Sequence, residues 1–369
     1  MNTRPQFVSR SSQLPPQIYY VHPLMLKGLA AWREVFAHAR DLGFDTVLTA
    51  PLFERGHNSS VFVTKGFDRL DPALGLGSSV TEAVGALVQA ATDNKLKIML
   101  DLAIDRVAVD EASGSVVADP RVPPHKAGSQ RIDPTRDPGH LDDWLARMRL
   151  LTGLGIAGFR CLGIASLAPE AWFNIILSTR KSAPETTFLA WTPGSDFEVR
   201  KALEGTGFDG SFSSLAWWDL EERWIMEEYQ IQRQIGYQIT FPEAPFGKRV
   251  AHGTDSWEVL QRKAVRALRL SSTFASGLMI PMGFEYGAAA PLDPMHGDGT
   301  GLRAFANGAR STFPAIFAPS TPGRTRRLPV SRVGRSSSLH QPNAGRCSDA
   351  DGSGGCAKLT ESACRRPQS

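Results

Sequence analysis

The sequence of 369 residues has no uninterrupted apolar run of the roughly 18 residues that a membrane-spanning helix needs. Its first twenty residues, MNTRPQFVSRSSQLPPQIYY, also lack the apolar core of a secretory signal. Both absences argue against membrane insertion and export. A cytoplasmic location is therefore predicted, with no membrane partner.

Cysteine is scarce, and no two of the four cysteines have the CxxC spacing. Cys347, Cys356 and Cys364 lie near the C-terminus at spacings that fit no zinc pattern. We therefore expect no metal site and no cofactor. Cys161 stands in an apolar run and is predicted to be a buried thiol.

Most of the chain has no net positive charge, although the formal net charge of the whole sequence is +4. Residues 302–369 hold eleven Lys or Arg and three Asp or Glu, a net charge of +8, so the preceding residues carry −4. Because the body of the protein is mildly acidic, it has no basic footprint for nucleic acid. No nucleic-acid partner is expected.

Apolar segments of strand length alternate with amphipathic segments of helix length. Eight such strands and seven intervening helices predict a parallel sheet covered by helices and closed into a (β/α)₈ barrel. An open doubly wound sheet is the alternative, but no GxGxxG follows the first strand. The predicted strands are 18–23, 46–53, 97–104, 158–164, 186–192, 210–218, 237–242 and 277–282; the predicted helices are 29–42, 79–94, 139–154, 169–182, 196–205, 219–235 and 256–275.

The predicted barrel spans residues 18–290, after an N-terminal extension at 1–17. Its last helix is missing or replaced, because no helical period follows the eighth strand. Residues 291–369 are rich in Arg, Ser, Pro and Gly, a composition that buries too little apolar surface to offset the entropy of ordering. They are predicted to be a disordered tail.

Two charged residues stand inside apolar strands. Asp101 lies in MLDLAIDR and Arg160 in GFRCLG, at the ends of the third and fourth predicted strands. A buried charge is costly unless it is paired. Since these strands are neighbours, the sequence predicts an Asp101–Arg160 ion pair.

The same stretches resemble conserved regions of the α-amylase family. LDLAIDR is similar to a region in which Asp-x-x-x-Asn-His follows the third strand; Asp101 matches, while Asp105 and Arg106 replace Asn and His. GFRCLG is similar to Gly-Phe-Arg-x-Asp, with Leu162 in place of the nucleophilic Asp. FLAWTPG is similar to a region that carries the general acid, here replaced by Trp191.

Within that family the chain most resembles the α-1,4-glucan:maltose-1-phosphate maltosyltransferases. The resemblance covers about residues 18–290 and includes LGFDTVLTAPLF, GIAGFRCLG, SSLAWWDLEERW and GLMIPMGFEYG. It implies retaining α-glucan chemistry, with α-glucan or maltooligosaccharide as ligand. The β-sandwich domain that follows the barrel in this family has no counterpart in the sequence.

Further site candidates follow from the same resemblance. Asp255 is either the transition-state-stabilising carboxylate or part of the N-cap region of the next helix. His252 is either a contact for a sugar hydroxyl or a solvated loop residue. Together with Tyr286, Asp101 and Arg160, it completes the predicted substrate-binding set. No residue of the site is predicted to bind a metal ion.

The resemblance and the two lost carboxylates leave three readings of function. In the first, the barrel is catalytically silent and binds glucan, or supports an active maltosyltransferase as a domain or partner. In the second, it is active through displaced carboxylates, of which Glu243 and Glu285 are the candidates. In the third, the change of composition near residue 300 marks a truncated or frame-damaged product without its own function.

Overall fold

The computed structural model describes residues 14–56, 60–108, 117–118, 128–131 and 138–306. Eight parallel strands form a closed barrel in the order β1-β11-β10-β9-β8-β7-β3-β2. The barrel strands are β1 (Gln17–Val21), β2 (Thr46–Thr49), β3 (Lys97–Leu102), β7 (Gly158–Cys161), β8 (Thr187–Ala190), β9 (Gly210–Phe212), β10 (Tyr237–Thr240) and β11 (Gly277–Pro281). The predicted closed (β/α)₈ barrel is thereby confirmed, and the open-sheet alternative is excluded.

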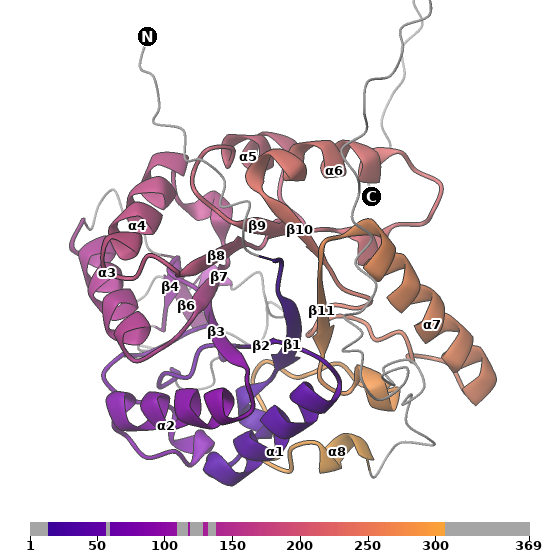
Figure 1. Cartoon of the computed structure of the whole chain (residues 1–369), viewed down its shortest axis with the longest axis horizontal. Coiled ribbons are helices and arrows are strands. Elements are labelled where there is room, and N and C mark those ends of the chain that lie inside the picture. The colour runs from indigo at the N-terminus through magenta and orange to yellow at the C-terminus, as the bar shows by residue number, and fades with distance from the viewer. Residues whose placement is uncertain (1–13, 57–59, 109–116, 119–127, 132–137, 307–369) are drawn as a thin grey trace, which may run out of the picture. The chain divides into compact units, whose positions relative to one another are not determined.

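Helices surround the ring of strands, as Figure 1 shows. They are α1 (Gly28–Asp41), α2 (Val80–Asp93), α3 (Pro138–Gly153), α4 (Pro169–Ser182), α5 (Phe197–Ala202), α6 (Trp224–Ile235), α7 (Trp257–Phe274) and the short α8 (Arg303–Ala306). In the sequence between β3 and α3, three short strands form a small antiparallel sheet of order β4-β6-β5. They are β4 (Arg106–Val107), β5 (Val117–Ala118) and β6 (Gly128–Arg131). No helix in the described part of the chain is both long and apolar enough to cross a membrane.

Local sequence explains where the helices begin. The Ser79 side chain caps α2 by accepting a hydrogen bond from the backbone N–H of Glu82, and Ser256 caps α7 in the same way from Val259. Pro169 opens α4, where a helix has no need of its N–H. These caps fix the starts of α2, α4 and α7 at or within one residue of the predicted positions.

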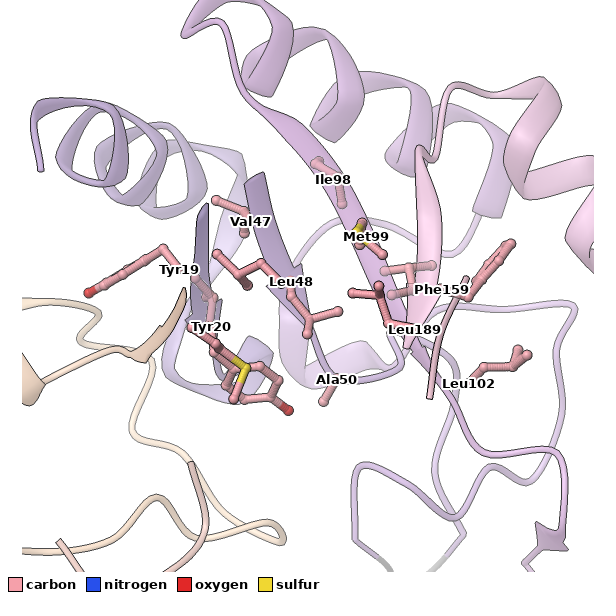
Figure 2. Packing of buried hydrophobic residues seen from close by; sticks show 14 of the residues in the cluster. Tyr19, Tyr20, Val47, Leu48, Ala50, Ile98, Met99, Leu102, Phe159 and Leu189 are labelled. Atoms are coloured by element: carbon pink, nitrogen blue, oxygen red, sulfur yellow. The ribbon is translucent and has the colours of Figure 1, made fainter. Parts of the chain in front are cut away.

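The strands are buried on both faces because one face lines the barrel and the other meets the helices. Figure 2 shows Tyr19 and Tyr20 of β1 pointing to opposite sides of the strand. Tyr20 faces inward and donates a hydrogen bond to Asp101, whereas Tyr19 faces outward and packs against His38 of α1. Cys161 is fully buried, as the sequence predicted.

Residues 291–306 differ from the predicted disordered tail. Leu292 and Leu302 are buried, and residue 300 forms an antiparallel bridge with Leu26. The His22 ring nitrogen Nε2 lies 2.7 Å from the carbonyl oxygen of Asp293. The segment therefore belongs to the barrel, and the predicted boundary at residue 290 is wrong for it. Residues 307–369, on which the rest of that prediction falls, lie outside the described residues.

The eighth strand is buried although α8, of four residues, is the only α-helix among the described residues that follow it. All five residues of β11 are buried, and α8 contacts the segment that follows the strand. Phe305 of α8 lies against Gly283 and stacks on Tyr286, with ring centroids 6.4 Å apart. The predicted replacement of the last helix thus takes the form of a loop and a short helix.

Candidate functional site

A cavity of about 560 Å³ lies at the carboxyl ends of the barrel strands, where barrel enzymes place their active sites. Its walls come from the segments that follow β7, β8, β9 and β10, with one residue from the segment after β2. None of the described residues that line it is Asp, Glu or His. The lining residues are Phe62, Arg160, Leu162, Gly163, Trp191, Pro193, Gly194, Ser214, Trp217, Ala244, Pro245, Phe246 and Gly247.

Leu162 and Trp191 lie side by side on this cavity. The N–H of Leu162 donates to the carbonyl of Leu102 at 2.9 Å, and the N–H of Trp191 donates to the carbonyl of Cys161 at 2.9 Å. Each residue is therefore the first after its strand, β7 for Leu162 and β8 for Trp191. The structure brings together the two positions that the resemblance assigns to nucleophile and general acid.

Arg160, which lines the cavity, is paired with Asp101 of β3. Arg160 donates from Nε to Oδ1 of Asp101 at 2.5 Å and from Nη2 to Oδ2 at 2.7 Å. The Tyr20 hydroxyl donates to the same carboxylate at 2.9 Å. The structure thus shows the ion pair that the sequence predicted, buried at the neighbouring ends of β3 and β7.

Arg160 stays charged near neutral pH. Burial lowers the pKa of Arg160, but the Asp101 carboxylate and the Tyr20 hydroxyl together outweigh this effect, so that the net shift is upward. Burial raises the pKa of the Tyr20 hydroxyl well above its usual value. Neither group can therefore exchange a proton with a substrate near neutral pH, which is what general acid–base catalysis requires.

Trp191 is held by packing on both sides. Its ring stacks on Phe241 with centroids 5.3 Å apart and an interplanar angle of 17°, and the Arg160 guanidinium carbon lies 4.7 Å from the ring centroid. Phe212 adds a third contact at 5.2 Å. The indole therefore fills volume and covers the Arg160 charge, and it has no carboxylic proton to donate.

Glu243, one candidate for a displaced carboxylate, does not line the cavity. One of its oxygens lies 2.9 Å from Nη1 of Arg249, and the other accepts a hydrogen bond from the backbone N–H of Val250 at 2.7 Å. Burial raises the pKa of Glu243, although Arg249 opposes the shift. A raised pKa suits a general acid, but a general acid must also reach the reacting bond, and Glu243 faces Arg249 instead.

Glu285, the other candidate, lies on the outside of the barrel wall. Its Oε1 accepts hydrogen bonds from the Tyr19 hydroxyl at 2.5 Å and from His38 of α1 at 2.9 Å. Tyr19 points away from the barrel interior (Figure 2). The glutamate therefore ties α1 to the segment after β11 and lies apart from Leu162 and Trp191.

Asp255 and Tyr286 line a different cavity, of about 740 Å³, between the start of α7 and residues 286–305. Asp255 immediately precedes Ser256, the N-cap of α7, in agreement with the second of the two readings left open for it. Tyr286 stacks between His38 and Phe305. Neither is among the residues at the cavity that holds Leu162.

His252 and Asp105 are likewise absent from the first cavity. His252 is exposed in the loop before α7, in agreement with its reading as a solvated residue. Asp105 is buried and accepts a hydrogen bond from the Ser166 hydroxyl at 3.4 Å. The side chain of Arg106 lies outside the described part of the structure.

Sequence reasoning missed two aromatic residues of the cavity wall, Phe62 and Phe246. They contact each other edge to face, with centroids 5.3 Å apart, from loops distant in sequence. Loop residues follow no hydrophobic period, so no pattern marks them. The position of Phe246 shortly after β10 is the only available signal, because ligand contacts gather at strand ends.

No protein-family model matches the chain. The chain is similar to the alpha-1,4-glucan:maltose-1-phosphate maltosyltransferase of Burkholderia pseudomallei (strain K96243), with 29% identity over 352 residues. The match covers 86% of this chain and 30% of that protein, so the chain spans under a third of the length of the curated relative it matches.

Solved structures with the same fold include an alpha-glucosyl transfer enzyme and two alpha-amylases. The alpha-glucosyl transfer enzyme XgtA has a TM-score of 0.62, with 12% identity over 83% of this chain and 84% of its own. An alpha-amylase from Geobacillus thermoleovorans has a TM-score of 0.60, with 12% identity over 82% and 78%. An alpha-amylase from Lactobacillus plantarum has a TM-score of 0.57, with 18% identity over 77% and 74%.

These likenesses confirm the resemblance stated from the sequence. The fold is the α-amylase-type barrel, and the chain is related to a maltosyltransferase. Because the sequence identities to the solved structures are low, these structures support the fold alone.

Proposed function

We propose that this protein is a catalytically silent α-glucan barrel. It binds maltooligosaccharide at the strand-end cavity and supports an active maltosyltransferase in the cytoplasm. The observation that carries the proposal is the cavity itself: Leu162 and Trp191 stand where the resemblance expects two carboxylates, and no described lining residue replaces them.

The chemistry of these two side chains supports the proposed lack of catalytic activity. Retaining glycoside transfer needs two carboxyl groups about 5–5.5 Å apart, one to attack the anomeric carbon and one to exchange a proton. Leu162 has no lone pair, and the indole N–H of Trp191 does not titrate usefully. Loss of members of such a catalytic unit costs up to about a millionfold in rate.

An active enzyme with displaced carboxylates is the rival function, and the contacts of the candidates count against it. The Glu243 carboxylate is paired with Arg249, and the Glu285 carboxylate is held by Tyr19 and His38. Moving either glutamate into the cavity would break a buried ion pair or buried hydrogen bonds, which is costly in a low-dielectric interior.

Size and one exposed aromatic ring favour a sugar ligand. The cavity volume of about 560 Å³ lies within the usual range for small-molecule sites of about 300–1,000 Å³. Trp217 is 55% exposed at the rim and makes a T-shaped contact with Phe241, so more than half of the residue's surface remains accessible. An amphipathic aromatic face of this kind suits the apolar face of a sugar ring.

Calorimetric titration with maltotriose and maltoheptaose tests the binding. Trp217→Ala should weaken binding roughly threefold to tenfold, the worth of one aromatic contact. Phe197→Ala is the matched control, since Phe197 is 45% exposed on α5 and does not line the cavity. Absence of binding by the unaltered protein, or equal losses in the two variants, would remove the proposal's glucan site.

The supporting role has its own test. Addition of the protein to a competent maltosyltransferase, with maltose-1-phosphate as donor, should raise the rate of glucan extension, and the Trp217→Ala variant should raise it less. An unchanged rate at protein concentrations well above those of the enzyme would limit the proposal to glucan binding. Cell fractionation tests the cytoplasmic location.

A further inference from the structure

The outer face of α7 carries positive charge on an otherwise mildly acidic barrel. The helix holds four basic residues and one acidic residue, Glu258. Arg262, Arg266 and Arg269 follow one another at spacings of four and three residues, so they share one helix face. All three are exposed.

These three arginines have no ion-pair partner in the described structure. By contrast, the exposed Arg40 of α1 is paired with Asp41. Glu258 stands four residues before Arg262, a spacing that favours pairing, yet the two form no ion pair. The stripe on α7 is thus uncompensated positive charge.

Apolar residues flank the stripe and form an open groove with it. Val265, Leu270 and Phe274 line this groove together with the three arginines, Gln261 and Thr273, over about 640 Å³. Phe274 packs edge to face on Trp218, with centroids 5.8 Å apart, which fixes one end of the groove. The surface therefore offers apolar contact and positive charge together.

Charge excludes two occupants from the protein itself. A two-fold dimer whose axis passes through the groove would set the arginine stripe against its own copy, since such an interface repeats the same surface on both subunits. Residues 302–369 carry a net charge of +8, so they too would be repelled by the stripe. A complementary occupant must be acidic.

We infer that the α7 groove binds an acidic amphipathic segment of a separate polypeptide. Its Asp or Glu residues lie opposite Arg262, Arg266 and Arg269, and its apolar residues contact Val265, Leu270 and Phe274. The apolar walls favour a polypeptide over nucleic acid, for which three charges alone give weak, salt-sensitive binding. This inference is independent of glucan binding at the strand-end cavity, because no residue that lines the groove also lines that cavity.

Fluorescence anisotropy with the full chain tests the inference. The probe is a labelled 18-residue helical peptide with Glu and Leu at helical spacing on one face; a peptide with Lys in place of Glu serves as its control. Arg262→Glu with Arg266→Glu and Arg269→Glu should weaken binding of the acidic peptide at least roughly tenfold, because three attractive charge contacts become repulsive. Circular dichroism confirms that the variant folds.

A charge-matched variant separates the groove from net charge. Arg33→Glu with Lys181→Glu and Lys201→Glu changes the total charge equally at exposed positions on α1, α4 and α5. It should bind the acidic peptide as the unaltered protein does. No binding of the acidic peptide, equal losses in both triple variants, equal binding of the Lys peptide, or displacement of the peptide by polyuridylic acid at a lower concentration than by unlabelled peptide would overturn the inference.

Discussion

Replacement of Arg160 by methionine probes its buried ion pair with Asp101. The side chains of Arg160 and Asp101 are 3% and 0% exposed. Arg160→Met keeps much of the aliphatic packing but leaves the Asp101 carboxylate without the two guanidinium N–H groups at 2.5 and 2.7 Å. Breaking a buried pair by removing one partner costs about 3–5 kcal/mol.

That cost is large against a net stability of about 5–15 kcal/mol for a folded domain. At about 2–4 °C per kcal/mol for a domain of this size class, the midpoint of thermal unfolding should fall by roughly 6–20 °C. Urea unfolding followed by tryptophan fluorescence measures the free energy directly. The midpoint should fall while the slope with urea stays constant, provided that the variant alters stability alone.

Two further variants make the result interpretable. Arg160→Met with Asp101→Leu removes both charges and should recover most of the loss, because a well-packed apolar pair often replaces a buried ion pair at little cost. Arg40→Ala removes a pair whose side chains are 47% and 65% exposed, and should cost less than about 1 kcal/mol. The reasoning fails if Arg160→Met costs no more than Arg40→Ala, or if the double variant is as unstable as the single one.

Two other predictions concern pH and catalytic rescue. Burial lowers the pKa of His22 to about 4, whereas its pKa in the unfolded chain is about 6.5. The neutral, buried ring therefore makes its full contribution to the free energy of unfolding above pH 6.5. Up to about 3 kcal/mol of this free energy is lost as the pH falls to 4. The free energy of unfolding measured with urea should fall between pH 6.5 and 4 in the unaltered protein and in His252→Gln, but not in His22→Phe. If the fall persists in His22→Phe, another group causes it. Leu162→Asp with Trp191→Glu should give at best weak hydrolysis of maltooligosaccharides, since supporting residues are also altered. A crystal structure with these two carboxyl groups more than about 10 Å apart would refute their assignment to catalytic positions.

The barrel could be predicted from the sequence because its strands are continuous apolar segments between amphipathic helices. The Asp101–Arg160 pair was also predictable, since two charges in adjacent buried strands have few other ways to be satisfied. The positions of Leu162 and Trp191 followed from the resemblance of GFRCLG and FLAWTPG to family regions; β7 and β8 end three and two residues before the predicted strand ends. The features that could be predicted are thus the regular strands and helices and the pairing of buried charges.

The surroundings of the site were less predictable. A position after a strand end does not fix which way a loop residue points: Gly283 and Gly287 adopt positive φ of 90° and 66°, and the turn between them brings Glu285 to the outer wall. Residues 291–306 order through scattered contacts, including Leu292 and Leu302, which leave no periodic pattern. Composition alone therefore misplaced the end of the barrel.

The most direct test of the account is incubation of the protein with α-maltosyl fluoride. This donor has a good leaving group and needs no general acid, so it isolates the nucleophile position that Leu162 occupies. Retaining chemistry would form a covalent glycosyl–protein intermediate and release fluoride. Because Leu162 cannot attack the anomeric carbon, fluoride should be released at the rate seen in buffer alone, and intact-protein mass spectrometry should show no maltosyl adduct. Saturable, protein-dependent fluoride release that persists after further purification, or an adduct of maltosyl mass, would contradict it.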